Sequence, residues 1–141
     1  MSANFLRIAL ACCAAIIAGA GAAQGDVVIN EIMYHAHSLI DVDDADFIEF
    51  HNTRAAPVDL SDWCVSGIGF CFPPGTSISA GGYLVIGRTS SGFLAAYGFQ
   101  PDYVFEGTLS NGGETLELLN SVGAPVEQIT YDDEGLWPPT A

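Results

Sequence analysis

The sequence predicts an all-β fold, an antiparallel β-sandwich, from three observations. Short apolar runs recur along the 141 residues at intervals of about ten residues, a spacing typical of sandwiches. Gly and Pro stand between these runs, where turns are needed. Long helical periodicity is absent, and a parallel sheet would need helices between its strands. About seven short strands in antiparallel sheets are therefore expected.

The stretch DADFIEFHN, residues 44–52, shows the pattern of a strand with one buried face. Ile48 and Phe50 alternate there with Glu49 and His51, so the two apolar side chains are expected to point into the core. The other runs are identified by β-branched content and flanking turn residues. The predicted strands lie within residues 26–34, 46–51, 58–65, 69–78 with a turn at 73–75, 81–87, 115–120 and 126–131.

The last two of these runs predict a hairpin. Leu116 and Leu118 alternate with polar residues, and the turn residues SVGAP separate 115–120 from 126–131. The run GGYLVIG, 81–87, is apolar without alternation, which predicts a strand that is buried on both faces or crosses the core.

One short helix is expected over SSGFLAAYG, residues 90–98. Phe93, Leu94 and Tyr97 lie at helical spacing, between serine at the start and glycine at the end.

The N-terminal residues 1–25 are predicted to be a secretory signal peptide. Arg7 precedes the apolar run IALACCAAIIAGA, and Ala20-Gly21-Ala22 fits the small-residue pattern of a cleavage site. A membrane anchor would need about 20 clearly apolar residues, and this run is shorter and diluted by Ala and Gly. Cys12 and Cys13 lie inside the run, too early for a lipid-anchored N-terminus. The mature domain is therefore expected over residues 26–141, with no membrane span after cleavage.

Charge and cysteine content narrow the function classes. The chain has 17 Asp plus Glu against 3 Lys plus Arg, and nucleic-acid binding depends on cations that this chain lacks. The acidic surplus fits a soluble exported protein and an affinity for divalent cations. Export would place Cys64 and Cys71 where disulfides persist, so a bridge between neighbouring strands is expected. Two buried reduced thiols are the alternative.

Six stretches follow one another in a recognisable order: VVINEIMYH (27–35), DADFIEFHN (44–52), VDLSDW (58–63), FPPGTSISAGGYLVIG (72–87), FEGTLSNGGETLELLNSVGAPVEQITY (105–131) and WPP (137–139). Together they make the chain similar to the lamin tail domain family, and specifically to its exported bacterial members. The resemblance implies an immunoglobulin-like β-sandwich.

The chain departs from the family pattern in two ways. The rod of heptad repeats found in nuclear lamins is absent, so filament assembly and a nuclear address do not carry over. The family pattern continues past the WP segment into a closing strand that is missing here, which predicts a fragment of a longer secreted protein.

Several positions in these stretches have expected structural roles. Asn30 and Glu31 are polar residues in an apolar strand, so they are expected to bond to a neighbouring loop. Asn52 ends its strand and favours an Asx turn. Trp63 is expected at the centre of the sandwich. Positive φ is expected in two glycine turns, and the full set of motif positions is Asn30, Glu31, Glu49, Asn52, Trp63, Gly81, Gly82, Asn111, Gly112, Gly113 and Trp137.

The acidic stretch DVDDAD, residues 41–46, is the candidate calcium site. It does not match a helix–loop–helix calcium loop, because Asp46 stands where glycine is needed and Asn52 where a bidentate Glu is needed. A solvated acidic loop leading into a strand is the alternative. The candidate ligands are Asp41, Asp43, Asp44, Asp46 and Glu49.

Catalytic groups are not recognisable in the sequence. His35, His37 and His51 would suit a transition metal, but their spacing does not bring His51 near the other two. A G-x-S-x-G elbow and a phosphate-binding glycine loop are both lacking.

The resemblance therefore implies a secreted, non-catalytic module for adhesion, tethering or protein–protein contact at the cell envelope. No cofactor is expected, and the partner is an unknown protein or envelope component. The alternatives are an appendage of a secreted metal-dependent hydrolase encoded beyond residue 141, and a calcium-stabilised structural domain.

Overall fold

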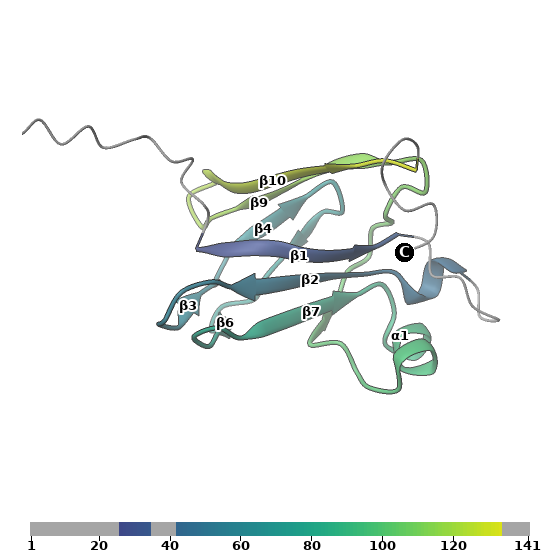
Figure 1. Ribbon diagram of the computed structural model, residues 1–141, viewed down its shortest axis with the longest axis horizontal. Coiled ribbons are helices and arrows are strands. Elements are labelled where there is room, and N and C mark those ends of the chain that lie inside the picture. The colour runs from purple at the N-terminus through teal and green to yellow at the C-terminus, as the bar shows by residue number, and fades with distance from the viewer. Residues whose placement is uncertain (1–25, 35–41, 134–141) are drawn as a thin grey trace, which may run out of the picture.

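The computed structural model describes residues 26–34 and 42–133, which form two packed β-sheets (Figure 1). The first sheet has the strand order β1-β2-β7-β8, the second has the order β10-β9-β4-β5, and β3 and β6 form a separate pair. This confirms the predicted sandwich. The elements are β1 (Val27–Met33), the 3-10 turn η1 (Val42–Ala45), β2 (Phe47–Asn52), β3 (Val58–Asp59), β4 (Cys64–Ser66), β5 (Phe70–Cys71), β6 (Ser77–Ile78), β7 (Tyr83–Gly87), α1 (Ser90–Tyr97), β8 (Tyr103–Val104), β9 (Glu114–Leu119) and β10 (Pro125–Tyr131).

The first sheet is organised around β2, which pairs antiparallel with β1 on one side and β7 on the other. Phe50 lies between Ile29 of β1 and Leu84 of β7, and all three side chains are buried. Ile48 is also buried, so the predicted inward direction of Ile48 and Phe50 is confirmed. Because side chains alternate along a strand, Glu49 and His51 point to the outer face.

The second sheet contains the predicted hairpin of β9 and β10. Leu116 and Leu118 of β9 are fully buried, and Leu118 pairs with Val65 of β4. The turn between the two strands is held by Asn120, whose N–H donates to the Ala124 carbonyl at 2.9 Å. The inward faces of β2 and β9 thus supply the main layers of the core.

The strands β7 and β8 pair in parallel, which departs from the predicted antiparallel arrangement. Parallel neighbours need a crossover connection, and helix α1 lies in that connection. The predicted helix is confirmed, but its N-cap is Thr89, whose hydroxyl accepts from the Gly92 N–H at 2.9 Å. At the other end, Gly98 has a φ of 81°, the left-handed cap that glycine favours.

The expectation that 81–87 is buried on both faces is wrong for the start of β7. Tyr83 is 58% exposed, whereas Leu84 and Ile86 are buried. The strand alternates because its outer face meets solvent, and the apolar Tyr83 and Val85 stand on that face.

The two sides of the sandwich differ in how they are closed. On one side the edge strands β5 and β8 have two residues each, and rings of Phe70, Phe72 and Tyr103 contact one another between the sheets. On the other side the edge strands β1 and β10 have seven residues each, the longest strands of the described chain.

Candidate functional site

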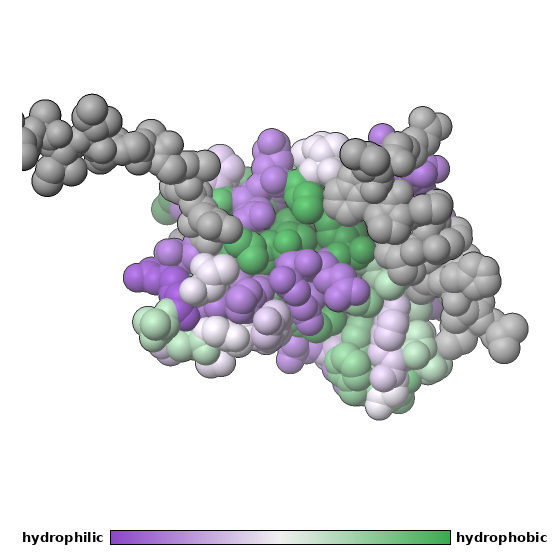
Figure 2. Space-filling view, in the orientation of Figure 1, coloured by the Kyte–Doolittle hydropathy of each residue, from purple (hydrophilic) through white to green (hydrophobic). Residues whose placement is uncertain are grey.

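A groove lies between the edge strands β1 and β10. Its volume is about 190 Å³, and it is lined by Ile29, Asn30, Glu31, Ile32 and Ile129. Figure 2 shows an apolar patch on this face, bordered above and below by hydrophilic residues. Ile29 is buried, whereas Ile32 and Ile129 are half-buried and pack only partly against the core. The groove is therefore an opening of the core to the surface.

An aromatic pair stands where the two strands beside the groove end. Tyr34 follows β1, Tyr131 ends β10, and their rings stack with centroids 4.8 Å apart. The Tyr131 hydroxyl lies 3.0 Å from the Ser110 carbonyl oxygen and 2.8 Å from Glu114 Oε1. Burial, reinforced by the nearby Glu114 carboxylate, raises the pKa of Tyr131 well above its ordinary value. The Tyr131 hydroxyl thus keeps its proton at ordinary pH, and its ring is fixed by the stack and by these two contacts.

The polar rim on the β1 side comes from a β-bulge. The register between β1 and β2 shifts between Ile29 and Glu31, and Asn30 Nδ2 donates to Glu49 Oε1 at 2.7 Å. The expectation that Asn30 bonds to a neighbouring loop is therefore wrong, because the bulge directs its amide toward the adjacent strand. Glu31 is exposed and stands opposite Glu49 in the strand pair. Two carboxylates therefore lie beside the groove.

A third carboxylate approaches the groove from β10. Glu127 lies two residues before Ile129 and pairs with Leu118, so it shares the inward side of the strand with Ile129. Burial raises the pKa of Glu127 above its ordinary value of 4.5. An inward-pointing charge on an edge strand opposes non-specific pairing of that edge with other chains.

We expect Glu127→Gln to stabilise the protein at neutral pH. The raised pKa means that the folded protein favours the protonated carboxyl of Glu127. The wild type is therefore at its most stable, with respect to this group, at low pH, and it loses free energy of unfolding as the pH rises through the pKa of Glu127 and the carboxyl ionises. Gln carries no charge and avoids this loss. Since Glu127 is only partly buried, the expected gain at pH 7 is a few tenths of a kcal/mol. Chemical denaturation at pH 7 and below about pH 4 measures it. Equal gains at both pH values would show that the charge is not the cause.

The acidic stretch 41–46 does not gather into a metal site within residues 26–34 and 42–133, where no group of three or more His, Cys, Asp and Glu converges. Asp46 is 1% exposed, and its backbone carbonyl accepts from the Arg88 N–H at 2.9 Å. The Asp44 carbonyl accepts from the Thr89 hydroxyl at 3.1 Å. The backbone of this segment therefore anchors the start of α1. Glu49 lies on the outer face of β2, and the remaining candidates Asp41, His35 and His37 and the side chain of Asp43 lie outside the described residues.

Calcium is therefore expected to leave the stability unchanged. An ion that binds only the folded state raises the melting temperature. Without such an ion, the mature chain should melt at the same temperature in millimolar calcium and in excess chelator. A melting temperature that rises with calcium would contradict this, and the matched variant Asp44→Asn would then show whether the 41–46 segment is responsible.

His51 and Tyr83 stack on the outer face of the first sheet. They are cross-strand partners in β2 and β7, with ring centroids 4.4 Å apart and planes 11° apart. The imidazole is thus engaged with an aromatic neighbour on the sheet surface.

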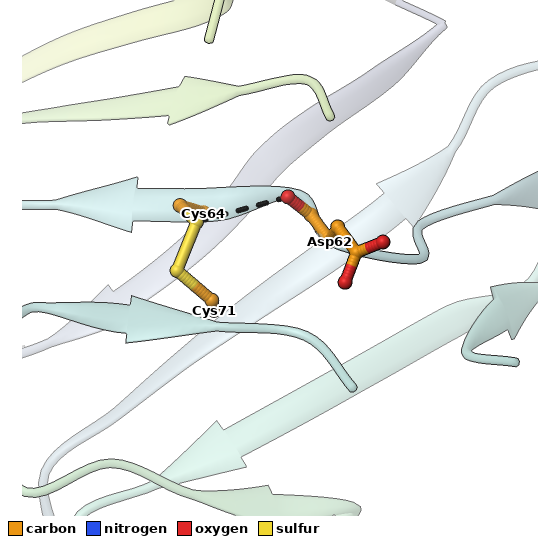
Figure 3. Close-up of a disulfide and its surroundings, with 3 residues drawn as sticks. All are labelled: Asp62, Cys64 and Cys71. Carbon is orange, nitrogen blue, oxygen red and sulfur yellow. Dashed lines mark hydrogen bonds between the residues drawn. A yellow bond between two sulfur atoms is a disulfide. The ribbon is translucent and has the colours of Figure 1, made fainter. Parts of the chain in front are cut away.

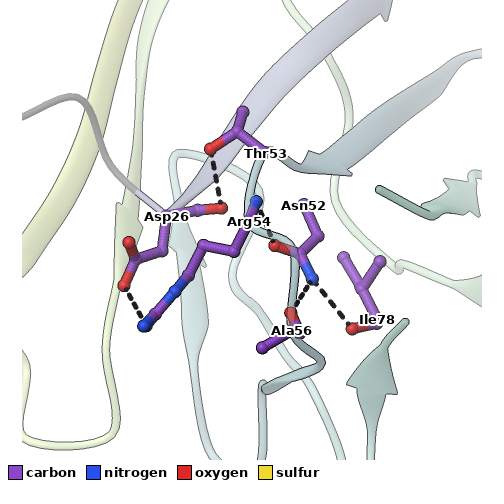
Figure 4. Close-up of polar contacts among 6 residues, drawn as sticks. All are labelled: Asp26, Asn52, Thr53, Arg54, Ala56 and Ile78. Carbon is purple, nitrogen blue, oxygen red and sulfur yellow. Dashed lines mark hydrogen bonds and ion pairs between the residues drawn. The ribbon is translucent and has the colours of Figure 1, made fainter. Parts of the chain in front are cut away.

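Asn52 connects three segments at the end of β2 (Figure 4). Its side-chain oxygen accepts from the Arg54 N–H at 2.9 Å, which confirms the expected Asx turn. Its amide also donates to three carbonyls, at 2.8 Å to Ala56, 3.1 Å to Ile78 and 2.9 Å to Ser79. The side chain is fully buried, so it holds the corner between β2 and β6 from inside. The bonds to Ile78 and Ser79 could not be foreseen, because both residues lie more than 25 positions along the chain from Asn52.

An exposed ion pair and a hydrogen bond join the residue before β1 to the residues after β2. Arg54 pairs with Asp26 at 3.0 Å, and both side chains are 54% exposed. The Thr53 hydroxyl donates to the Asp26 carbonyl at 3.2 Å. These bonds join the start of β1 to the end of β2 (Figure 4).

The glycine expectations are met in part. Gly81 has a φ of 63° and Gly113 one of 89°, whereas Gly82, Asn111 and Gly112 do not have positive φ. Gly82 lies in a tight place for a different reason, because a Cβ there would lie 2.5 Å from Ser79 Oγ and 3.1 Å from the Ser79 carbonyl oxygen, and both would have to shift.

Trp63 lies at the edge of the core. Trp63 is half-buried and packs against the edge of the core, so the expected place at its centre is wrong. Phe50 and Phe72, in edge-to-face contact 5.4 Å apart, occupy the interior instead. Trp137 lies outside the described residues.

Cys64 and Cys71 form a disulfide between β4 and β5, where they are direct cross-strand partners (Figure 3). The Asp62 carbonyl oxygen lies 3.7 Å from Cys64 Sγ. Since a disulfide sulfur carries no proton, this is a contact and not a hydrogen bond. The bridge fixes the short edge strand β5, which carries Phe70 of the aromatic closure.

Replacing both cysteines with serine is expected to lower the free energy of unfolding by about 2 to 3 kcal/mol. The bond closes a short loop, and the chain-entropy relation gives this magnitude for its length. Denaturant unfolding of the double variant measures the loss, and wild type under reducing conditions should match it. A mass that does not rise on reduction of the intact protein would show that the thiols are not bridged.

Sequence reasoning missed the groove residues Ile29, Ile32 and Ile129, and it missed Glu127, which faces the same side of β10. The three isoleucines look like ordinary core residues in a strand, and strand order decides that they meet an opening. The lengths of the predicted runs gave no signal, because the last run, 126–131, is no longer than the runs before it.

None of the described helices is long and apolar enough to cross a membrane. Comparison with curated proteins gave no match. A family profile described as Lamin Tail Domain matches residues 20–133. That match covers most of the sequence, and the two sheets, antiparallel except for the β7–β8 pair, are those of an immunoglobulin-like fold. The chain therefore belongs to the lamin tail domain family, a family of non-catalytic immunoglobulin-like domains.

Proposed function

We propose that the protein is exported and acts as a non-catalytic module that holds another protein at the cell envelope. The groove between β1 and β10 is the observation that carries this proposal. It opens core side chains to the surface along the two longest edge strands, and exposed edges of this kind pair readily with other chains.

Export is supported by two features. The predicted signal peptide occupies residues 1–25, and the Cys64–Cys71 bond is a feature of proteins in oxidising compartments. The net charge of −14 is compatible with this and favours solubility in any compartment.

The appendage alternative places a metal-dependent hydrolase beyond residue 141. Reading the gene past Ala141 tests it, since a catalytic domain in the same frame would make this module a part of an enzyme. An immediate stop codon would remove that alternative.

Cell fractionation of the producing organism tests the proposed function. The mature chain, shortened by its signal peptide, should be recovered with the envelope. Ile32→Lys places a charge in the groove and should release the protein into the medium. Val104→Lys, on the opposite edge strand where Val104 is 47% exposed, should leave retention unchanged. Melting curves establish that both variants are folded. An uncleaved cytoplasmic protein, or equal retention of both variants, would overturn the proposal.

A further inference from the structure

The two sides of the sandwich present different edges to a partner. The β5 and β8 edges offer two residues each and are closed by aromatic contacts. The β1 and β10 edges offer seven residues each, in the part of the chain that the structure describes. An edge strand leaves alternate N–H and C=O groups directed outward, so β1 can pair with an added extended segment.

The floor of the groove suits side chains of an extended segment. Its volume of about 190 Å³ is smaller than pockets for drug-sized ligands, which start near 300 Å³. Ile29, Ile32 and Ile129 make the floor apolar. The Tyr34–Tyr131 stack lies where both strands end, so we expect an occupant to extend along the groove toward Val27.

The charge around the groove decides among occupants. Glu31 lines it, Glu49 is held beside it by Asn30, and Glu127 faces inward from β10. Its lining residues include no cation, and the described arginines stand elsewhere, Arg54 with Asp26 and Arg88 after β7. A second copy carries the same net charge of −14 and would place the same three carboxylates against this rim, so the two copies would repel each other. A cationic segment would neutralise the rim and speed association.

We propose that this groove binds an extended segment of a partner protein in which aliphatic side chains alternate with Lys or Arg. The segment adds a strand to the edge of β1 that pairs with no strand among residues 26–34 and 42–133. Its aliphatic side chains fill the groove and its cations meet Glu31, Glu49 and Glu127. This inference rests on the proposed function and names the chemistry of the partner. The burial of Glu127 supports it, because a cation arriving at the groove removes the cost of that partly desolvated carboxylate.

Synthetic peptides test the inference with the complete mature chain. The probe alternates valine and lysine, one control alternates valine and glutamate, and a second control has the composition of the probe with the lysines grouped together. We expect only the alternating lysine peptide to bind, and to protect β1 amides from hydrogen exchange. Ile32→Lys should weaken binding about tenfold, whereas Val104→Lys should not change it. The double variant Glu31→Gln with Glu127→Gln should weaken binding about threefold and reduce its salt dependence.

Four outcomes overturn the inference. Equal binding of the grouped-lysine peptide would show non-specific attraction to an acidic protein. Protection of the β1 edge before peptide is added would show that the chain itself fills the groove. Dimerisation in sedimentation experiments that Ile32→Lys abolishes would identify a second copy as the occupant. If the peptide fails to bind although Ile32→Lys releases the protein from the envelope, the contact function stands and the cationic partner is wrong.

Discussion

Replacing Asn52 with alanine is expected to lower the free energy of unfolding by about 3 to 5 kcal/mol. The side chain is fully buried, and it satisfies the Arg54 N–H and the carbonyls of Ala56, Ile78 and Ser79. Alanine leaves these groups without partners in a place that water reaches poorly. Denaturant unfolding, followed by tryptophan fluorescence, measures the loss.

Asn120→Ala is the matched control for that variant. Asn120 also caps a turn through its side-chain oxygen, which accepts from the N–H groups of Val122 and Ala124. This turn is exposed, so water replaces the lost bonds and the expected cost is below about 1 kcal/mol. Similar losses in the two variants would mean that turn capping alone, and not the buried connection, accounts for the effect at Asn52.

Phe50→Ala is expected to cost a comparable amount, about 3 to 5 kcal/mol. The ring is fully buried at the middle of the first sheet, between Ile29 and Leu84, and it contacts Phe72 edge to face. Removing it leaves a cavity where the two sheets meet. Thermal and denaturant unfolding measure the effect.

The neighbouring position supplies the control for Phe50. Glu49 precedes Phe50 in β2 but points to the outer face. Glu49→Gln keeps a side-chain oxygen that can accept a hydrogen bond from Asn30 Nδ2. Its expected effect is within about 0.5 kcal/mol. A large effect at Glu49 and a small one at Phe50 would contradict the assignment of buried and exposed faces to β2.

The fold could be predicted because its main signals are local. The alternation around Ile48 and Phe50 predicts β2 and its buried face, since side-chain direction in a strand depends only on position along it. The turn residues between 115–120 and 126–131 predict the β9–β10 hairpin for the same reason. The helix 90–98 was predicted from its capping residues, with a difference of one residue at the cap.

The remaining features depend on contacts between distant residues. The parallel pairing of β7 with β8 follows from where α1 returns the chain, and no pattern within either strand shows it. Asn52 was expected to form a local turn, but its bonds to Ile78 and Ser79 cross from β2 to the corner after β6. The groove arises because the first and last described strands, β1 and β10, become edges on the same side. Strand order decides all three.

The candidate calcium site could not be judged from the sequence either, because it too depends on how the chain folds. Asp44, Asp46 and Glu49 are close in sequence, yet a turn followed by a strand sends them in different directions. Asp46 is buried, Asp44 is half-buried and Glu49 lies on the outer face. Clustering in sequence is therefore a poor guide to convergence when a strand intervenes.

The shared direction of β1 and β10 has a mechanical consequence. Both strands end at the Tyr34–Tyr131 stack, so the chain enters at Asp26 and leaves β10 at the opposite end (Figure 1). Seven residues of strand span about 23 Å. Tension between the two ends acts along the strands, across hydrogen bonds that run perpendicular to them. The bonds of β1 and β10 are loaded in shear and must break together, so the domain resists stretching better than one whose strands peel apart singly.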